Sequence, residues 1–218
     1  TKKDFLPLHI KGDMNLLPME HVMQKASAQV KSALILSALN LRGKTKIIEK
    51  RNTRDHTEKL MDYLKVKFKK KVLNKNSTSI ELNGPYEIKP RNINVASDPS
   101  SAAFFIVGAL IIPKSNITLK NIALNKTRIA FIDVLKKMGG KIKIKKTKTL
   151  SGEDVGEINV IHSLLKGIKI SSTSSPYLID EYPILSVAAS QAKGLTTMKG
   201  LSELRHKESD RIKSIISN

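Results

Sequence analysis

The sequence contains no cysteine and no tryptophan among its 218 residues, and aromatic residues make up only 4%. Without cysteine the chain cannot form a disulfide, a thiolate nucleophile or a cysteine-based metal site. The five histidines have no spacing typical of metal ligands, and the glycine patterns of P-loops and dinucleotide-binding folds are missing. We therefore expect neither a metal centre nor a cofactor.

The sequence also lacks a long apolar run. The longest, at residues 102–112, is far shorter than the roughly 18 residues that span a bilayer. The first residues show no signal-peptide pattern either. We expect a globular, cytoplasmic protein with no membrane partner. Because the chain starts with threonine and stops within a helical pattern, we also expect it to be a piece of a longer chain.

Acidic residues are scarce: 19 stand against 39 lysines and arginines, which gives a formal net charge of +20. This excess attracts nucleic acid, anionic membranes or small phosphorylated substrates. Few aromatics accompany the basic residues, which argues against stacking on single-stranded bases. A basic nucleic-acid-binding module remains an alternative that charge alone supports. Lysine runs such as 67–71 and 141–148 are more typical of a solvated surface.

One order of predicted elements recurs three times: an apolar helix, a strand, a polar turn and a second helix. Thr45, Thr118 and Thr197 mark the recurring strand, with spacings of 73 and 79 residues. Such a period indicates repeated supersecondary units of an α/β protein. The expected helices cover 26–41, 56–65, 102–112, 129–138, 182–192 and a segment from 212, and the expected strands cover 5–12, 45–48, 66–73, 78–82, 116–120, 141–145 and 196–199.

Each polar turn places an arginine at the start of a helix, behind a residue type that caps helices: Thr53-Arg54, Thr127-Arg128 and Asp210-Arg211. The helix dipole disfavours a cation at this end unless the cation binds an anion. Two interpretations stay open. The guanidinium groups hold a phosphate or carboxylate ligand, or they pair with neighbouring acids such as Asp55, Asp133 or Asp210.

Two further segments carry candidate catalytic carboxylates. Asp180 and Glu181 directly precede Pro183 and an apolar helix, an arrangement that fits simple helix capping. Alternatively, Asp180 lies among apolar neighbours as a partly desolvated general base. Residues 205–211, Arg-His-Lys-Glu-Ser-Asp-Arg, form the densest charge cluster of the chain and include Glu208. The two carboxylates make an acid and base pair if the fold brings them together.

The helix at 26–41 is apolar nearly all round, so we expect it to be buried on most faces. It opens with Ser27-Ala28-Gln29. Ser27 fits a purely structural N-cap. Gln29 places an amide at the positive end of this helix, where it needs a polar partner, and a ligand is one candidate.

Five segments, taken together and in this order, resemble the 5-enolpyruvylshikimate-3-phosphate synthase family: residues 26–33, 53–58, 98–105, 178–183 and 205–211. The resemblance covers essentially the whole chain but only the middle of the family's chain. It implies parts of two similar domains of repeated βαβαββ units, the inside-out α/β barrel fold of enolpyruvyl transferases. The proline-rich stretch 84–101 matches the family's crossover. We therefore expect the shikimate-phosphate domain at 1–96 and the phosphoenolpyruvate and proton-transfer domain at 97–218.

The resemblance implies transfer of the enolpyruvyl group of phosphoenolpyruvate to the 5-hydroxyl of shikimate 3-phosphate, with release of phosphate and no cofactor. Both substrates are polyanions, and two carboxylates of raised pKa are expected to move the protons. The family's members are typically monomers. The implied catalytic residues are Asp180 and Glu208, and the implied substrate-binding residues are Ser27, Ala28, Gln29, Arg54, Asp180, Lys207 and Arg211.

The sequence departs mildly from the family at Thr53 and His206, where the family more often has serine and valine. The family's N-terminal lysine, its first phosphate-binding elements and its C-terminal basic residues have no counterpart. We therefore predict that this stretch alone does not turn over. A related enzyme acting on UDP-N-acetylglucosamine shares the fold and chemistry, but it lacks the pattern at 205–211.

Overall fold

The computed structural model describes residues 9–13 and 15–217, and it divides into two compact units. The first unit comprises Thr1–Thr53 and Leu64–Pro90, and the second comprises Arg54–Tyr63 and Arg91–Asn218. The expected domain boundary between residues 96 and 97 stays a prediction. Of the strand expected over 5–12, residues 5–8 lie outside the described part, and residues 9–12 form no strand.

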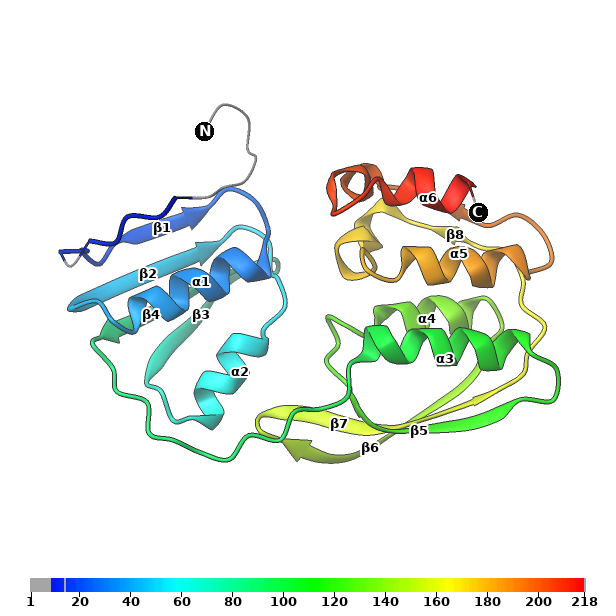
Figure 1. Ribbon diagram of the computed structural model, residues 1–218, viewed down its shortest axis with the longest axis horizontal. Helices are drawn as coiled ribbons and strands as arrows, with labels where there is room; N and C mark the ends of the chain where they lie inside the picture. The colour runs from blue at the N-terminus through cyan, green and yellow to red at the C-terminus, as the bar shows by residue number, and fades with distance from the viewer. Residues whose placement is uncertain (1–8, 14, 218) are drawn as a thin grey trace. The chain divides into compact units, whose positions relative to one another are not determined.

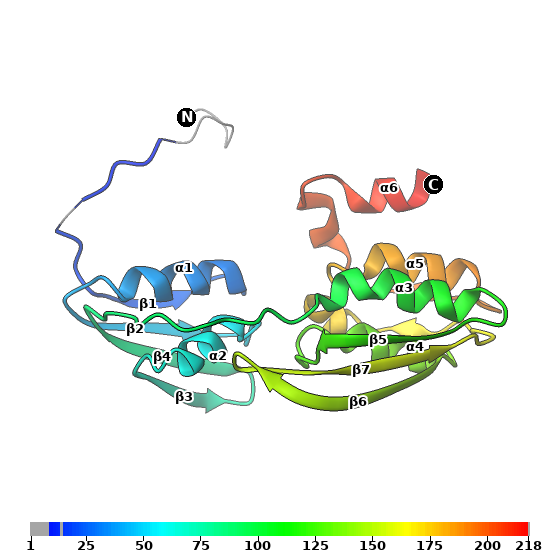
Figure 2. The ribbon, with the colours of Figure 1, turned by 60° about the horizontal axis from the view of Figure 1, so that its bottom comes forward.

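The first unit is a four-stranded sheet with a helix on one face (Figures 1 and 2). Its strands lie in the order β1-β2-β4-β3, and β1 runs parallel to β2 whereas the other neighbours are antiparallel. Ile47 of β2, Ile80 and Leu82 of β4, and Ile35 and Ala38 of the helix are buried and form a small core. The elements are β1 (Glu20–Met23), α1 (Ala28–Ala38), β2 (Gly43–Glu49), β3 (Phe68–Asn74) and β4 (Ser77–Gly84).

The helix α1 is less buried than its sequence predicts. Only Lys31, Ile35 and Ala38 are buried in it, whereas Val30 and Leu36 are exposed. The expectation of burial on most faces is therefore wrong for the described residues, because only the face toward β2 and β4 meets other structure. On that face Lys31 forms an ion pair with Glu49 at 3.2 Å, and both side chains are almost fully buried.

The second unit contains a three-stranded antiparallel sheet, β5-β7-β6, and a helical layer in which α3 packs against α5 (Figure 2). One continuous apolar core joins these helices to the sheet and to α4. The elements are α2 (His56–Tyr63), α3 (Pro99–Ile111), β5 (Asn116–Ala123), α4 (Ala130–Lys137), β6 (Lys141–Leu150), β7 (Glu153–Ile161), β8 (Lys169–Ile170), η1 (Ser172–Tyr177), α5 (Tyr182–Ser190), β9 (Thr197–Met198), η2 (Ser202–His206) and α6 (Arg211–Ser217).

The element order confirms the predicted repeat and completes it. The first copy reads β1-α1-β2-α2-β3-β4, which is one βαβαββ unit. In the second copy a single parallel bridge between Ser97 and Ile122 stands in place of the first strand, before α3-β5-α4-β6-β7. The third copy contains β8-α5-β9-α6, again with a parallel pair at its start. These opening strands of two to four residues are too short to show an alternating pattern in the sequence.

Candidate active site

Asp180 and Arg54 form the central contact of the candidate site, within the second unit. Arg54 directly precedes Asp55 at the entry to α2, and Asp180 lies just before α5. The Arg54 guanidinium donates a hydrogen bond from Nη2 to Asp180 Oδ2 at 2.6 Å, across 126 residues of sequence. Both side chains are about one-third exposed, 28% for Arg54 and 33% for Asp180. The pair is therefore accessible from solvent.

Arg211, the first residue of α6, reaches the same carboxylate from another side. Its Nη1 lies 3.4 Å from Asp180 Oδ1 and 3.4 Å from the carbonyl oxygen of Ile179. Its Nη2 donates to Glu208 Oε2 at 2.8 Å. Asp180 thus lies between two guanidinium groups, one on each carboxylate oxygen. Two of the three arginines that the sequence singled out at helix starts thus meet at one acid, and Arg211 also pairs with its sequence neighbour Glu208.

This geometry sets the charge of Asp180. Partial burial by itself raises the pKa of Asp180, but the hydrogen bonds and charges of Arg54 and then Arg211 outweigh it and hold the pKa below its ordinary value. Asp180 is consequently an anion at neutral pH. The expected raised pKa is wrong for this carboxylate.

Glu208 and Lys207 lie at the outer side of the site. The Glu208 side chain is 82% exposed, and a hydrogen bond from its own backbone N–H, followed by one from Arg211, lowers its pKa. The expected raised pKa is therefore wrong for Glu208 as well, because solvent surrounds the carboxylate. Lys207 pairs with Glu203 at 3.2 Å, one helical turn back in the chain. Asp210 caps α6 by accepting a hydrogen bond from the Lys213 N–H at 3.0 Å.

Arg128, the second arginine of the repeat, has a different environment. Its Nη2 donates to Asp98 Oδ1 at 2.7 Å and to the Ser100 hydroxyl at 2.7 Å. Asp98 is the N-cap of α3, accepting from the Ser101 N–H at 2.8 Å. The Ser100 hydroxyl in turn donates to the carboxylate of Glu181, a residue that is only 2% exposed. Arg128, just before α4, therefore binds the start of α3, and Ser100 links the start of α3 to that of α5.

Glu181 differs from Asp180 although the two are adjacent. Burial raises the pKa of Glu181, the hydrogen bond from Ser100 lowers it, and the negative charge of Asp180 raises it further; the net direction is upward. One turn at the start of α5 thus presents an accessible anion at 180 and a buried acid at 181. Sequence reasoning noted the pair but assigned no role to Glu181.

A polar cluster fixes α2 to the sheet of the second unit, and sequence reasoning missed it. His56 Nδ1 lies in hydrogen-bond contact with Glu153 Oε1, and Lys59 Nζ lies 3.1 Å from Glu153 Oε2. Asn125 donates to Asp55 Oδ1 at 2.8 Å. These contacts hold the segment that carries Arg54. No sequence signal links them, because the partners lie 70 to 97 residues apart.

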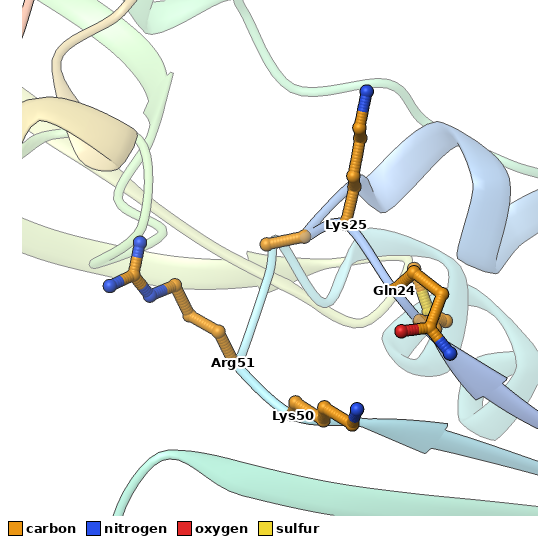
Figure 3. Close-up of a pocket in the computed structure, with 6 residues that line it drawn as sticks. Gln24, Lys25, Lys50 and Arg51 are labelled. Atoms are coloured by element: carbon orange, nitrogen blue, oxygen red, sulfur yellow. The ribbon is translucent and has the colours of Figure 1, made fainter.

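Ser27, Ala28 and Gln29 lie in the first unit, at the start of α1. The structure confirms Ser27 as N-cap: its hydroxyl accepts from the Val30 N–H at 3.3 Å. Gln29 is exposed. Just before them, a pocket of about 170 Å³ is lined by Met23, Gln24, Lys25, Ala26, Lys50 and Arg51. Figure 3 shows that Lys25 comes from the segment before α1 and that Lys50 and Arg51 come from the turn after β2.

Of the predicted site residues, the structure thus brings Arg54, Asp180, Glu208 and Arg211 into one contact network and places Lys207 beside it. The described residues contain no group of three acidic or histidine side chains that could hold a metal ion. Within the same residues, no helix has the length and apolar character to cross a membrane.

The family model of EPSP synthase (3-phosphoshikimate 1-carboxyvinyltransferase) matches residues 1–218. The chain belongs to this family. Similar curated relatives include the 3-phosphoshikimate 1-carboxyvinyltransferases of Sphingopyxis alaskensis, 44% identical over 95% of this chain and 46% of the relative, and of Petrotoga mobilis, 44% identical over 97% of this chain and 48% of the relative. The chain therefore spans about half the length of the curated relatives that it matches.

Solved structures agree with the family assignment. An EPSP synthase from Acinetobacter baumannii is 38% identical and superposes with a TM-score of 0.82, covering 93% of this chain and 44% of that one. The enolpyruvyl transferase NikO from Streptomyces tendae is 13% identical with a TM-score of 0.60, covering 85% of this chain and 44% of that one, a likeness of fold alone. The expected fold class is thereby confirmed: the chain is a mixed α/β part of the enolpyruvyl transferase fold.

Proposed function

We propose that the protein to which this chain belongs transfers the enolpyruvyl group of phosphoenolpyruvate to the 5-hydroxyl of shikimate 3-phosphate and releases phosphate. The observation that supports this most directly is the carboxylate of Asp180, held between the guanidinium groups of Arg54 and Arg211 and open to solvent. Phosphate and carboxylate groups are the ligands that such paired guanidinium groups bind best. Both proposed substrates carry them.

In the addition a proton leaves the 5-hydroxyl and one reaches the methylene carbon of phosphoenolpyruvate; in the elimination a proton leaves the resulting methyl group as phosphate departs. Carboxylates are suited to each of these transfers. Asp180 is the proposed proton acceptor, because it is an anion within reach of solvent and of two anion-binding groups. Glu208 is the proposed second proton-transfer group. Its contact with Arg211 places it beside the same guanidinium as Asp180. These roles need no redox centre or organic cofactor.

The remaining residues have proposed binding roles. Arg54 is assigned to the phosphate of shikimate 3-phosphate and Arg211 to phosphoenolpyruvate, with Lys207 on the shikimate side. Ser27, Ala28 and Gln29 are assigned to shikimate 3-phosphate, with Gln29 also reaching phosphoenolpyruvate. We further propose that the two substrate-binding domains divide at residues 96 and 97. A cytoplasmic location, a monomeric state and the absence of nucleic-acid binding stay predictions.

The test is a coupled assay of phosphate release from the two substrates, using the full-length protein that contains these residues. We expect activity in the parent protein, and an Asp180→Asn variant that folds normally but loses most turnover. Asp154→Asn is the matched control, because Asp154 forms an exposed ion pair with Lys146 at 2.8 Å in the same unit. No phosphate release by the folded parent protein, or equal rates for both variants, contradicts the proposal. The 218-residue chain alone is expected to be inactive.

A further inference from the structure

The candidate site is filled by one of its own carboxylates. Arg54 and Arg211 each direct a guanidinium nitrogen at a different oxygen of Asp180, at 2.6 and 3.4 Å. A phosphate or carboxylate ligand that is bound bidentately needs two N–H groups of one guanidinium, and the terminal nitrogens are already engaged: Nη2 of Arg54 donates to Asp180, and Nη1 and Nη2 of Arg211 donate to Asp180 and Glu208. The carboxylate and an incoming oxyanion therefore compete for the same hydrogen bonds.

We propose that Asp180 occupies the oxyanion site formed by Arg54 and Arg211, so that its carboxylate must leave at least one of the two arginines before a ligand oxyanion binds there. This inference rests on the proposed binding roles of Arg54 and Arg211. It adds a consequence for Asp180: the group released by the ligand is the proposed proton acceptor. Binding thus converts a paired, weakly basic carboxylate into an available one.

Linkage gives the direction of this conversion. The two guanidinium groups hold the pKa of Asp180 down, and a bound oxyanion compensates their charge. The pKa of Asp180 then rises on binding, and by reciprocity the affinity for the oxyanion rises as Asp180 becomes protonated. The charged groups facing Asp180 from the packed elements are Arg54 before α2, Arg211 on α6 and the neighbouring Glu181.

The repeat supplies a matched control. Arg128 holds the equivalent place in the second copy and pairs with its own acid, Asp98, at 2.7 Å. That acid also caps α3, and asparagine caps helices as well as aspartate does. An Asp98→Asn variant therefore removes a carboxylate from a repeat arginine without touching Arg54 or Arg211.

The experiment titrates sulfate, which does not change its charge near neutral pH, into the 218-residue chain by calorimetry. We expect Asp180→Asn to bind sulfate about tenfold more tightly than the parent, since one charge-assisted hydrogen bond no longer has to be given up. Asp98→Asn is expected to change the affinity less than twofold. Replacing Arg54 or Arg211 by Gln in the Asp180→Asn background is expected to abolish the gain.

A crystal structure with sulfate separates competition from simple charge repulsion. Competition requires sulfate on Arg54 or Arg211, with Asp180 displaced from that guanidinium. Sulfate bound with both Asp180 contacts intact overturns the proposal, as does an unchanged or weakened affinity of folded Asp180→Asn and Asp180→Ala, or no measurable binding in any variant. These outcomes are independent of turnover. An active full-length enzyme whose Asp180→Asn variant shows no gain in affinity defeats this inference alone.

Discussion

Arg128 and Arg211 occupy corresponding places in the second and third copies of the repeat, yet their surroundings differ. Arg128 meets Asp98 and Ser100, which both belong to the start of α3 in its own copy. Arg211 reaches back to Asp180 before α5, and Arg54 of the first copy arrives at the same carboxylate. Two copies thus share one acid, whereas the middle copy keeps its own.

This difference distinguishes Arg128, which has a structural role, from Arg54 and Arg211, which are the proposed ligand-binding arginines. Arg128 bonds to the start of α3, where Ser100 in turn donates to buried Glu181, so an anion that took Arg128 would break the contacts of Arg128 with the start of α3. Asp180, by contrast, holds no helix cap through its side chain in the described structure, and its two partners are partly exposed. One sequence position in the repeat therefore serves packing in one copy and ligand binding, as proposed, in the others.

The largest effect is expected when the acid that each arginine contacts is replaced by asparagine. In the full-length protein, Asp180→Asn should lower kcat by about 10²–10⁴-fold, the usual contribution of a general base. Asp98→Asn should leave kcat within a few-fold of the parent, since the asparagine still caps α3. Steady-state phosphate release measures both. Comparable losses in the two variants would mean that the two acids do not differ as their surroundings indicate.

The next effect concerns the arginines themselves. Arg54→Gln and Arg211→Gln should each weaken substrate binding by about 100-fold, the value of one lost charge-assisted contact to a phosphate or carboxylate. Arg128→Gln should not change binding beyond its effect on stability. Calorimetric titration of shikimate 3-phosphate and phosphoenolpyruvate into the full-length protein gives these affinities. A loss of affinity for Arg128→Gln as large as that for Arg54→Gln would mean that Arg128, in the middle copy, also binds substrate.

The contrast between the copies explains what the sequence could predict. The helices and long strands appear close to their expected ranges, because each has enough residues to show its period: α3 was expected at 102–112 and lies at Pro99–Ile111. The strand β7 was missed although Ile158 and Val160 alternate with polar residues, so a signal was present. The short strands that open the first and third copies, β1 and β8, gave no such signal in the sequence.

The site could be predicted only in its parts. The five segments that resemble the family pointed to Arg54, Asp180 and Arg211. Nothing in the sequence shows that Arg54 and Arg211, which lie 126 and 31 residues from Asp180, share its carboxylate. The expected raised pKa values failed for a related reason. Whether an acid at a helix start meets guanidinium groups or is buried depends on the fold: Asp180 meets Arg54 and Arg211, whereas Glu181 is buried and accepts from Ser100.

A smaller effect should distinguish Arg128 from Arg211 in stability. Arg128→Met removes the donor to Asp98 and Ser100 and should lower the free energy of unfolding of the second unit by about 1–2 kcal/mol. Arg211→Met should cost less than about 1 kcal/mol, since its ion pairs face solvent. Native-state hydrogen exchange of α3 and α5 amides in the 218-residue chain reports these values. A greater loss of unfolding free energy for Arg211→Met than for Arg128→Met would mean that Arg211, and not Arg128, has the structural role.

The smallest effect is the pH dependence of Glu181, at the end of the Arg128 bonds. The folded pKa of Glu181 is raised, mainly by burial, so its contribution to stability is complete below its ordinary pKa of 4.5 and is lost as the pH rises through the folded value. Glu181→Gln cannot ionise and keeps an acceptor for Ser100. We expect the variant to gain roughly 1 kcal/mol over the parent at neutral to alkaline pH and to match it in acid. Urea unfolding of the 218-residue chain across this range measures the difference, with Asp154→Asn as control. A variant that is instead less stable than the parent at neutral pH and matches it in acid would mean that Glu181 is ionised in the fold and that Arg128, through Ser100, holds an anion after all.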